Sequence, residues 1–99
     1  MHVISRKKLR EFWDVEKEAE SPLDNWFRTA KQAEWKNLSE IRAVYSHADL
    51  FGNCVIFNIG GNKYRLITYI NFRVRRVYVL HVLTHKEYDK DAWKKSCDC

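Results

Sequence analysis

The spacing of hydrophobic residues changes near Asp49, and this change limits the kinds of fold that the chain can adopt. Before Asp49, apolar side chains recur every three or four positions, which is the period of an amphipathic helix. After it, residues 54–59, 63–72 and 76–83 are rich in β-branched and aromatic side chains, as strands are. The order of helices and then strands predicts an α+β fold.

Two helices and a shorter third are predicted in the first half of the chain. The first follows a short strand at residues 2–5 and begins at Ser5, a residue type that caps helices. The second begins at Ser21-Pro22, with serine as the cap and proline in the first helical position. The third begins at Ser39. Each helix has one apolar face, which is expected to pack against the sheet.

The second half of the chain predicts an antiparallel meander of three strands. Gly60-Gly61-Asn62 and residues 71–75 are turn sequences, and connections this short cannot make a parallel crossover. Alternation along 63–72 divides the strand into two faces. One face carries Tyr64, Leu66, Thr68, Ile70 and Phe72, and suits packing against helices, whereas the open face carries Lys63, Arg65, Ile67, Tyr69, Asn71 and Arg73.

The last predicted strand divides in the same way, although the sequence leaves its register open. Uninterrupted alternation separates one set, Val77, Val79, His81 and Leu83, from another, Arg76, Tyr78, Leu80 and Val82. Because His81 lies in an apolar run, we expect it to be a core or half-buried histidine.

The length and the cysteines of the chain predict one domain with a frayed end. Ninety-nine residues without a linker or repeat form a single domain, residues 1–99. Residues 91–99 are expected to be a loosely ordered tail, and the roles of Cys97 and Cys99 stay open. Cys54 lies in an apolar run and is expected to be a small buried residue. No C-x-x-C motif appears, and neither a metal nor a cofactor is expected.

Charge is distributed unevenly along the chain. The net charge is +5; residues 11–24 hold six acids and one base, whereas residues 63–76 hold Lys63, Arg65, Arg73, Arg75 and Arg76 and no acid. This basic segment predicts a polyanionic partner, although cations also keep a sheet edge from pairing. The apolar runs are too short to span a membrane, and the first residues are charged where a signal peptide is apolar. A cytoplasmic protein without a membrane partner is therefore expected.

Arg65 and the segment 85–89 are the candidate chemical groups. A guanidinium on a rigid strand can hold a phosphate bidentately and stabilise charge that develops on it, although it can also pair with a carboxylate. Residues 85–89 hold a histidine and a tyrosine, which suit proton transfer and stacking on a base. A charged structural turn is the alternative for this segment.

Four segments of the chain together resemble the HigB-type toxins of type II toxin–antitoxin systems, within the RelE/ParE-like superfamily. They are residues 1–12 (MHVISRKKLREF), Ala33-Glu34-Trp35 with Ser46-His47-Ala48-Asp49, residues 57–66 (FNIGGNKYRL) and residues 84–89 (THKEYD). The likeness runs from residue 1 to about residue 90, in order. FNxGGNxxR followed by THKEYD is the more specific part because both halves occur together.

The resemblance implies a fold, an activity and a set of partners. The fold is RelE-like, with an N-terminal strand and two to three helices packed on a curved antiparallel sheet. The activity is ribosome-dependent, metal-independent endoribonuclease cleavage of mRNA, and the partners are the ribosome, mRNA and a HigA-type helix-turn-helix antitoxin. Operator DNA would be bound only through the antitoxin.

The resemblance also implies a site. Arg65, His85 and Tyr88 are its expected catalytic residues, and Asp89 supports them. The expected phosphate-binding residues are Lys63, Arg73, Arg75, Arg76 and Lys86.

Two other functions are compatible with the same residues. A ParE-like gyrase poison would share the fold and lack ribonuclease activity. A non-catalytic RNA-binding module would use the basic segment without breaking a bond. Loss of cleavage with retained binding in an Arg65 variant would separate an enzyme from a binder.

Overall fold

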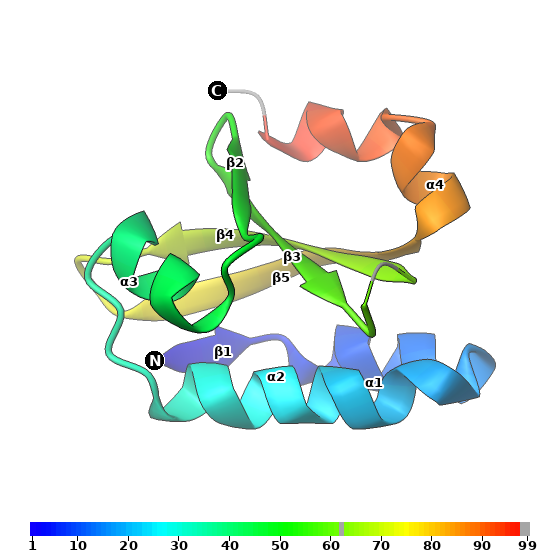
Figure 1. The fold of residues 1–99 in the computed structure, drawn as a ribbon, viewed down its shortest axis with the longest axis horizontal. Helices are drawn as coiled ribbons and strands as arrows, with labels where there is room; N and C mark the ends of the chain where they lie inside the picture. The colour runs from blue at the N-terminus through cyan, green and yellow to red at the C-terminus, as the bar shows by residue number, and fades with distance from the viewer. Residues whose placement is uncertain (62, 98–99) are drawn as a thin grey trace.

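The computed structural model describes residues 1–61 and 63–97, and it shows helices on both sides of a five-stranded sheet (Figure 1). The elements are β1 (His2–Ile4), α1 (Arg6–Val15), the 3-10 helix η1 (Lys17–Ala19), α2 (Glu20–Gln32), α3 (Leu38–Val44), β2 (Asp49–Phe51), β3 (Cys54–Ile59), β4 (Tyr64–Asn71), β5 (Arg76–Thr84), α4 (His85–Asp89) and the 3-10 helix η2 (Ala92–Cys97). The predicted α+β class is confirmed. Within the described residues, no helix has the length and apolar character needed to cross a membrane.

The strands are ordered β1-β5-β4-β3-β2. β3, β4 and β5 form the predicted antiparallel meander, and β2 adds an antiparallel edge that was not predicted because it is only three residues long. β1 pairs in parallel with β5, with His2 opposite Arg76, so the sheet is mixed. The chain between β1 and β5 contains the helices α1 to α3 and the strands β2 to β4, so the connection is long enough for parallel pairing.

The helices begin close to the predicted positions but use different caps in two cases. Ser5 is the N-cap of α1, as predicted. α2 begins at Glu20 because η1 runs directly into it, and Pro22 falls in the first turn, where its missing N–H costs no helical hydrogen bond. α3 begins after Asn37, whose Oδ1 accepts a hydrogen bond from the Glu40 backbone N–H at 3.0 Å, so Ser39 is not its cap.

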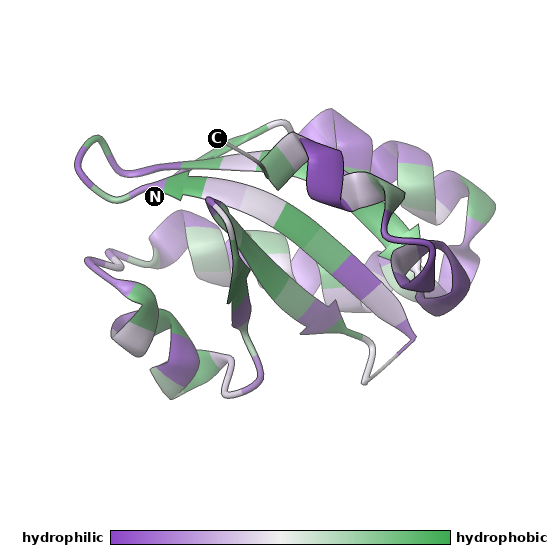
Figure 2. Ribbon diagram, turned by 90° about the horizontal axis from the view of Figure 1, so that it is seen from above, coloured by the Kyte–Doolittle hydropathy of each residue, from purple (hydrophilic) through white to green (hydrophobic). Residues whose placement is uncertain are grey.

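The main core lies between α1, α2 and α3 and one face of the sheet. Figure 2 shows apolar and hydrophilic residues alternating along α1 and α2, as expected for helices with one buried face. Trp26 of α2 contacts Phe57 of β3 edge-to-face, with ring centroids 5.4 Å apart. From β4, Tyr64, Leu66 and Ile70 enter this core, whereas Ile67 belongs to a second cluster on the opposite face. The predicted alternation of β4 is therefore confirmed.

A β-bulge changes the alternation of β5. Ile67 pairs with His81 and Thr68 pairs with Val79, so the residue between them, Leu80, has no partner in the β4 ladder. After the bulge the faces exchange. The prediction that His81 and Leu83 share a face with Val77 and Val79 is wrong, because Val82 packs with the main core and Leu83 with the second cluster.

The end of the chain covers the second cluster. The cluster consists of Cys54, Ile56, Ile67, Trp93 and Cys97, on the face of the sheet opposite α1 and α2. Residues 92–97 form η2 rather than the loose tail that was expected, and the side chains of Trp93 and Cys97 are 4% and 1% exposed. Cys99 lies outside the described residues.

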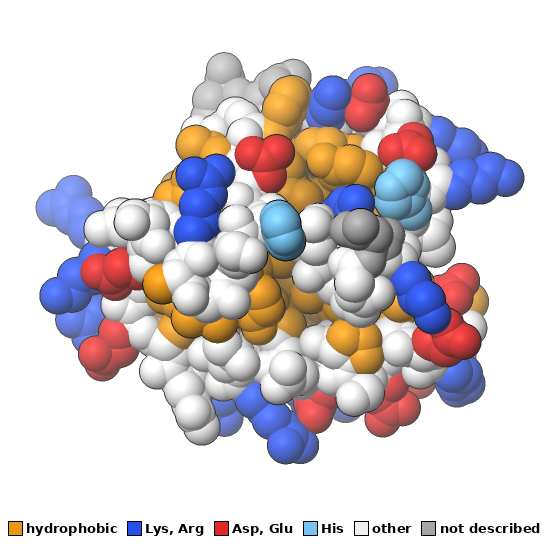
Figure 3. Space-filling model, in the orientation of Figure 1, with side chains coloured by type: hydrophobic (Ala, Val, Ile, Leu, Met, Phe, Trp, Pro, Cys, Tyr) orange, Lys and Arg blue, Asp and Glu red, His pale blue; other side chains and the backbone are white. Residues whose placement is uncertain are grey.

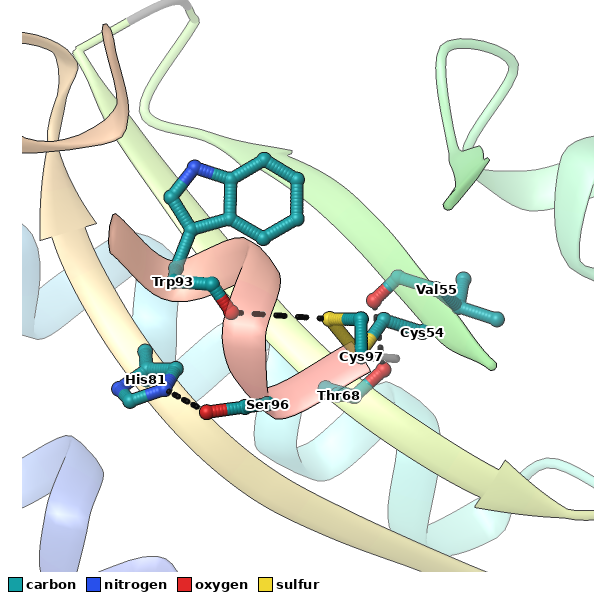
Figure 4. Close-up of a disulfide and its surroundings, with 7 residues drawn as sticks. All are labelled: Cys54, Val55, Thr68, His81, Trp93, Ser96 and Cys97. Atoms are coloured by element: carbon teal, nitrogen blue, oxygen red, sulfur yellow. Dashed lines mark hydrogen bonds between the residues drawn. A yellow bond between two sulfur atoms is a disulfide. The ribbon is translucent and has the colours of Figure 1, made fainter. Parts of the chain in front are cut away.

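A disulfide bond joins Cys54 to Cys97 and fixes η2 across the sheet (Figure 4). Cys54 is buried, as predicted, but it is half of a disulfide rather than a free thiol. The backbone N–H of Asn53 donates to the Cys97 carbonyl at 3.1 Å. At Gly52, with φ of +57°, a side chain would collide with that same carbonyl. The β2–β3 turn and η2 are thus closely packed.

Candidate active site

Arg65 lies on the open face of the sheet, opposite α1 and α2. In the register of the sheet it stands between Asn58 of β3 and Leu83 of β5. Its side chain is half-buried, and the guanidinium carbon lies 5.2 Å from the centroid of the Tyr88 ring. Nη1 donates a hydrogen bond to the Tyr64 carbonyl at 3.2 Å. A cation held against an aromatic ring at the edge of solvent can still receive a phosphate.

The helix α4 brings Tyr88 to Arg65. A reciprocal capping box begins the helix: Thr84 Oγ1 accepts from the Glu87 N–H at 3.2 Å, and Glu87 Oε1 accepts from the Thr84 N–H at 3.0 Å. The His85 N–H also donates to the Lys63 carbonyl at 3.1 Å, which ties the start of α4 to the segment before β4. These bonds fix a helix of only five residues, a length that is marginal alone.

His85 and Asp89 form a pair one helical turn apart on α4. His85 Nδ1 lies 3.2 Å from Asp89 Oδ2, and both side chains are more than half exposed. A neutral imidazole that donates from Nδ1 to the carboxylate presents Nε2 as a proton acceptor, and the carboxylate stabilises the imidazolium that forms. The pair therefore has the arrangement needed for proton transfer at the protein surface.

Lys63 forms an ion pair with Glu18. Lys63 Nζ and Glu18 Oε2 are 2.9 Å apart, on exposed side chains. The hydrogen bond and the charge of Glu18 raise the pKa of Lys63, and those of Lys63 lower the pKa of Glu18. The Lys63 ammonium group is therefore held in an ion pair with Glu18. Lys86 is exposed on α4.

The Trp93 ring packs against the Tyr88 ring. The two rings are stacked, with centroids 5.0 Å apart and planes inclined by 10°, and Trp93 Nε1 donates to the Tyr88 carbonyl at 2.9 Å. Since Trp93 belongs to η2, the disulfide indirectly fixes the ring on which Arg65 lies. No local pattern predicted this contact, because it depends on a turn at Asp91, whose φ is +60°.

The three remaining basic residues lie at the other end of the sheet. Arg73 and Arg75 belong to the turn between β4 and β5, and Arg76 is the first residue of β5; this turn lies opposite α4 in Figure 1. β4 spans eight residues, which corresponds to about 25 Å at roughly 3.3 Å per residue. The expected phosphate-binding residues are thus divided between two regions, because the antiparallel strands carry residues 65 and 75 to opposite ends.

A shallow hollow beside Arg65 includes residues to which the sequence analysis gave no role. It is lined by His47, Asn58 and Gly61, together with the end of α3. Asn58 is the register neighbour of Arg65, and His47 follows α3 in the loop before β2. Figure 3 shows histidine side chains and basic side chains beside exposed apolar surface on this face. His47 was noted only as part of a segment that resembles the family, because its place in the hollow depends on how α3 packs.

His81 lies beside η2 and is half-buried, as predicted. Its Nε2 is 2.8 Å from Ser96 Oγ (Figure 4). Burial, and then the charge of Lys8, lower the pKa of His81 below its ordinary value of 6.5. The unfolded chain therefore binds a proton at higher pH than the folded protein does. The stability that neutral His81 provides is present above pH 6.5 and is lost as pH falls through the lowered pKa.

His81→Gln tests this pH dependence, since glutamine can keep a hydrogen bond to Ser96 but does not titrate. We expect the free energy of unfolding to fall less in the variant than in the wild type between about pH 7.5 and about pH 5.5. Urea denaturation at both pH values measures the difference. An equal fall in the two proteins would show that His81 does not contribute.

In this small α+β protein, the short helix α4 carries both the ring that Arg65 contacts and the His85–Asp89 pair, at the protein surface. Residues 19–91 match the family model HigB_toxin, described as the RelE-like toxic component of a toxin–antitoxin system. The chain belongs to this family of toxins.

Individual relatives cover nearly the whole chain. It is 31% identical to the mRNA interferase HigB of Escherichia coli O6:H1 over 93 residues, which are 91% of this chain and 90% of the relative. It is 29% identical to the mRNA interferase toxin HigB of Escherichia coli K12 over 92 residues, 90% of this chain and 88% of the relative. The mRNA interferase HigB of Shigella flexneri is also 29% identical.

Proposed function

We propose that this chain is an mRNA interferase, a toxin that stops translation by cutting mRNA. The observation that carries the proposal is the contact of Arg65 with Tyr88, a residue of the same short helix, α4, that carries the His85–Asp89 pair. The names of the relatives, which call them mRNA interferases, support the same activity. A shallow, exposed site suits a large polymer better than an enclosed metabolite.

The proposed reaction is an internal transfer at the RNA phosphate. The ribose 2′-hydroxyl loses its proton and its oxygen attacks the adjacent phosphorus. The bond from phosphorus to the 5′-oxygen breaks as that oxygen gains a proton, and the products carry a 2′,3′-cyclic phosphate and a 5′-hydroxyl. His85, oriented by Asp89, is the proposed proton-transfer group. Arg65 stabilises the charge that develops on the phosphate, and Tyr88 stacks on a base or donates a hydrogen bond to the phosphate.

The other basic residues contribute binding in this proposal. Lys86 and Lys63 supply positive charge near the scissile phosphate, with Glu18 exchanged for the phosphate as the partner of Lys63. Arg73, Arg75 and Arg76 contact RNA away from the cut.

The proposed biological setting is a type II toxin–antitoxin module. The toxin acts in the cytoplasm as one domain, cuts mRNA on the ribosome without a metal, and is neutralised by a HigA-type helix-turn-helix antitoxin. It meets operator DNA only through that antitoxin. Membership of a family of toxic components supports an antitoxin partner.

Induction of the chain in a bacterial host tests the proposed activity against the gyrase-poison alternative. We expect growth to stop, and primer extension on total RNA to reveal new 5′ ends within coding sequences. DNA should remain free of gyrase-linked breaks. Growth arrest with intact mRNA and trapped gyrase would contradict the proposal, and arrest with neither lesion would favour a non-catalytic RNA-binding module.

A further inference from the structure

A second aromatic surface lies on the open face of the sheet, away from Arg65. Tyr69 of β4 and Tyr78 of β5 are register partners, and their rings are stacked with centroids 5.9 Å apart and planes inclined by 28°. Tyr69 is 37% exposed although it lies in the middle of a sheet. Tyr78 is half-buried, so the stacked pair is partly open to solvent, which points to a ligand that stacks or packs there.

Polar groups surround this pair in a hollow beside the end of η2. Asn53, Asn71 and Ser96 line it together with the two tyrosines. Asn71 Oδ1 accepts hydrogen bonds from the backbone N–H groups of Arg73 and Val74. In the part of the chain that the structure describes, the NH2 group of Asn71 has no partner, so it can donate to the edge of a base.

Positive charge adjoins the hollow. Arg76 is the register partner of Asn71 and stands two residues before Tyr78, so the alternation of β5 directs it to the same face. Arg73 and Arg75 lie in the turn just before Arg76. All three side chains are exposed, and none forms an ion pair within the described residues. Stacked rings next to unpaired guanidinium groups are the chemistry with which proteins bind single-stranded nucleic acid.

We propose that Tyr69, Tyr78, Asn71 and Arg76 form a second RNA-binding subsite, which stacks a base and holds a neighbouring phosphate. The inference rests on the proposed RNA-cleaving function and extends it, because this subsite contacts the RNA away from the scissile bond. η2 covers the sheet between the two regions, so the RNA would cross over or around η2. The absence of acidic residues from 63–76 favours a polyanion over a basic peptide.

Binding of a short single-stranded oligoribonucleotide that carries 2-aminopurine tests the subsite. Every protein carries Arg65→Ala, so that cleavage does not affect the measurement. Tyr69→Ala and Tyr78→Ala should each weaken binding roughly 5- to 100-fold and reduce the quenching of 2-aminopurine. Tyr69→Phe and Tyr78→Phe keep the ring and should bind as the parent does. Arg76→Ala should lower the slope of log K against log salt by about 0.7.

The outcomes separate this subsite from the catalytic proposal. Val15→Ala, at an 81% exposed position on α1, is the matched control and should bind unchanged. Unchanged binding in both tyrosine-to-alanine variants, or no binding by the parent, would overturn the subsite without affecting the cleavage proposal. Loss of binding in the alanine variants, in a chain that proves not to cut mRNA, would support the subsite and reject the activity. Loss of antitoxin binding with unchanged RNA binding would identify a protein-binding surface instead.

Discussion

Arg65→Ala is expected to slow the cleavage of mRNA about 100- to 1,000-fold, the usual cost of removing a group that stabilises charge in the transition state. Arg65 projects from a central strand onto the open face, so its removal leaves the main core untouched. The single-turnover rate on ribosome-bound mRNA measures the loss, and thermal unfolding shows that the variant still folds.

Arg65→Lys and Arg10→Ala are the matched variants. Lysine keeps the charge but loses the bidentate fork, so we expect an intermediate rate. Arg10 is exposed on α1, on the other side of the sheet, and its removal should leave the rate unchanged. Binding of the antitoxin should survive in both Arg65 variants. A rate within a few-fold of the wild type in Arg65→Ala would exclude Arg65 from the reaction.

Cys97→Ser is expected to lower the free energy of unfolding by about 4 kcal/mol, because the disulfide closes a long loop whose ends are 43 residues apart. The same change frees η2, which covers Ile56 and Ile67 and holds Trp93 under Tyr88. Cleavage should therefore weaken together with stability. Urea denaturation and the single-turnover rate measure the two effects.

Three comparisons make the disulfide prediction specific. Cys54→Ser and the wild type in dithiothreitol should both match Cys97→Ser, since each removes the same bond. Cys99→Ser should match the oxidised wild type. Loss of stability in Cys99→Ser, with none in Cys97→Ser, would mean that a different pair of cysteines is joined. Thiol alkylation of protein taken directly from cells measures how much of the disulfide forms there, because disulfides are rare in a reducing compartment.

Local signals in the sequence predicted most of the fold. The apolar run at 54–59 and the Gly60-Gly61 turn set the edges of β3, and Ser5 set the start of α1. The misses arose from interactions between distant residues. A bulge in β5 depends on how it pairs with β4, and the order of η2 depends on Cys54, which lies 43 positions away. No spacing rule could have revealed either of them.

In the candidate site, too, local patterns account for some of the contacts and distant residues for the others. Arg65 and Tyr88 meet because the antiparallel pairing sets residue 65 opposite residue 83, just before α4, and the helical period sets His85 beside Asp89. The distribution of charge was harder to predict. Arg65 lies near the start of β4 and Arg73 follows its end, so the length of the strand separates them. Lys63 forms an ion pair with Glu18, a residue far away in the sequence.

Cleavage of a defined mRNA on purified translating ribosomes tests the central proposal most directly. The wild type, Arg65→Ala and His85→Ala are compared, and the same mRNA without ribosomes serves as the control. We predict new ends at in-frame positions with the wild type, almost none with either variant, and none on naked RNA. Intact mRNA with all three proteins, under conditions where the wild type still stops growth, would contradict the proposal that this chain is an mRNA-cutting toxin.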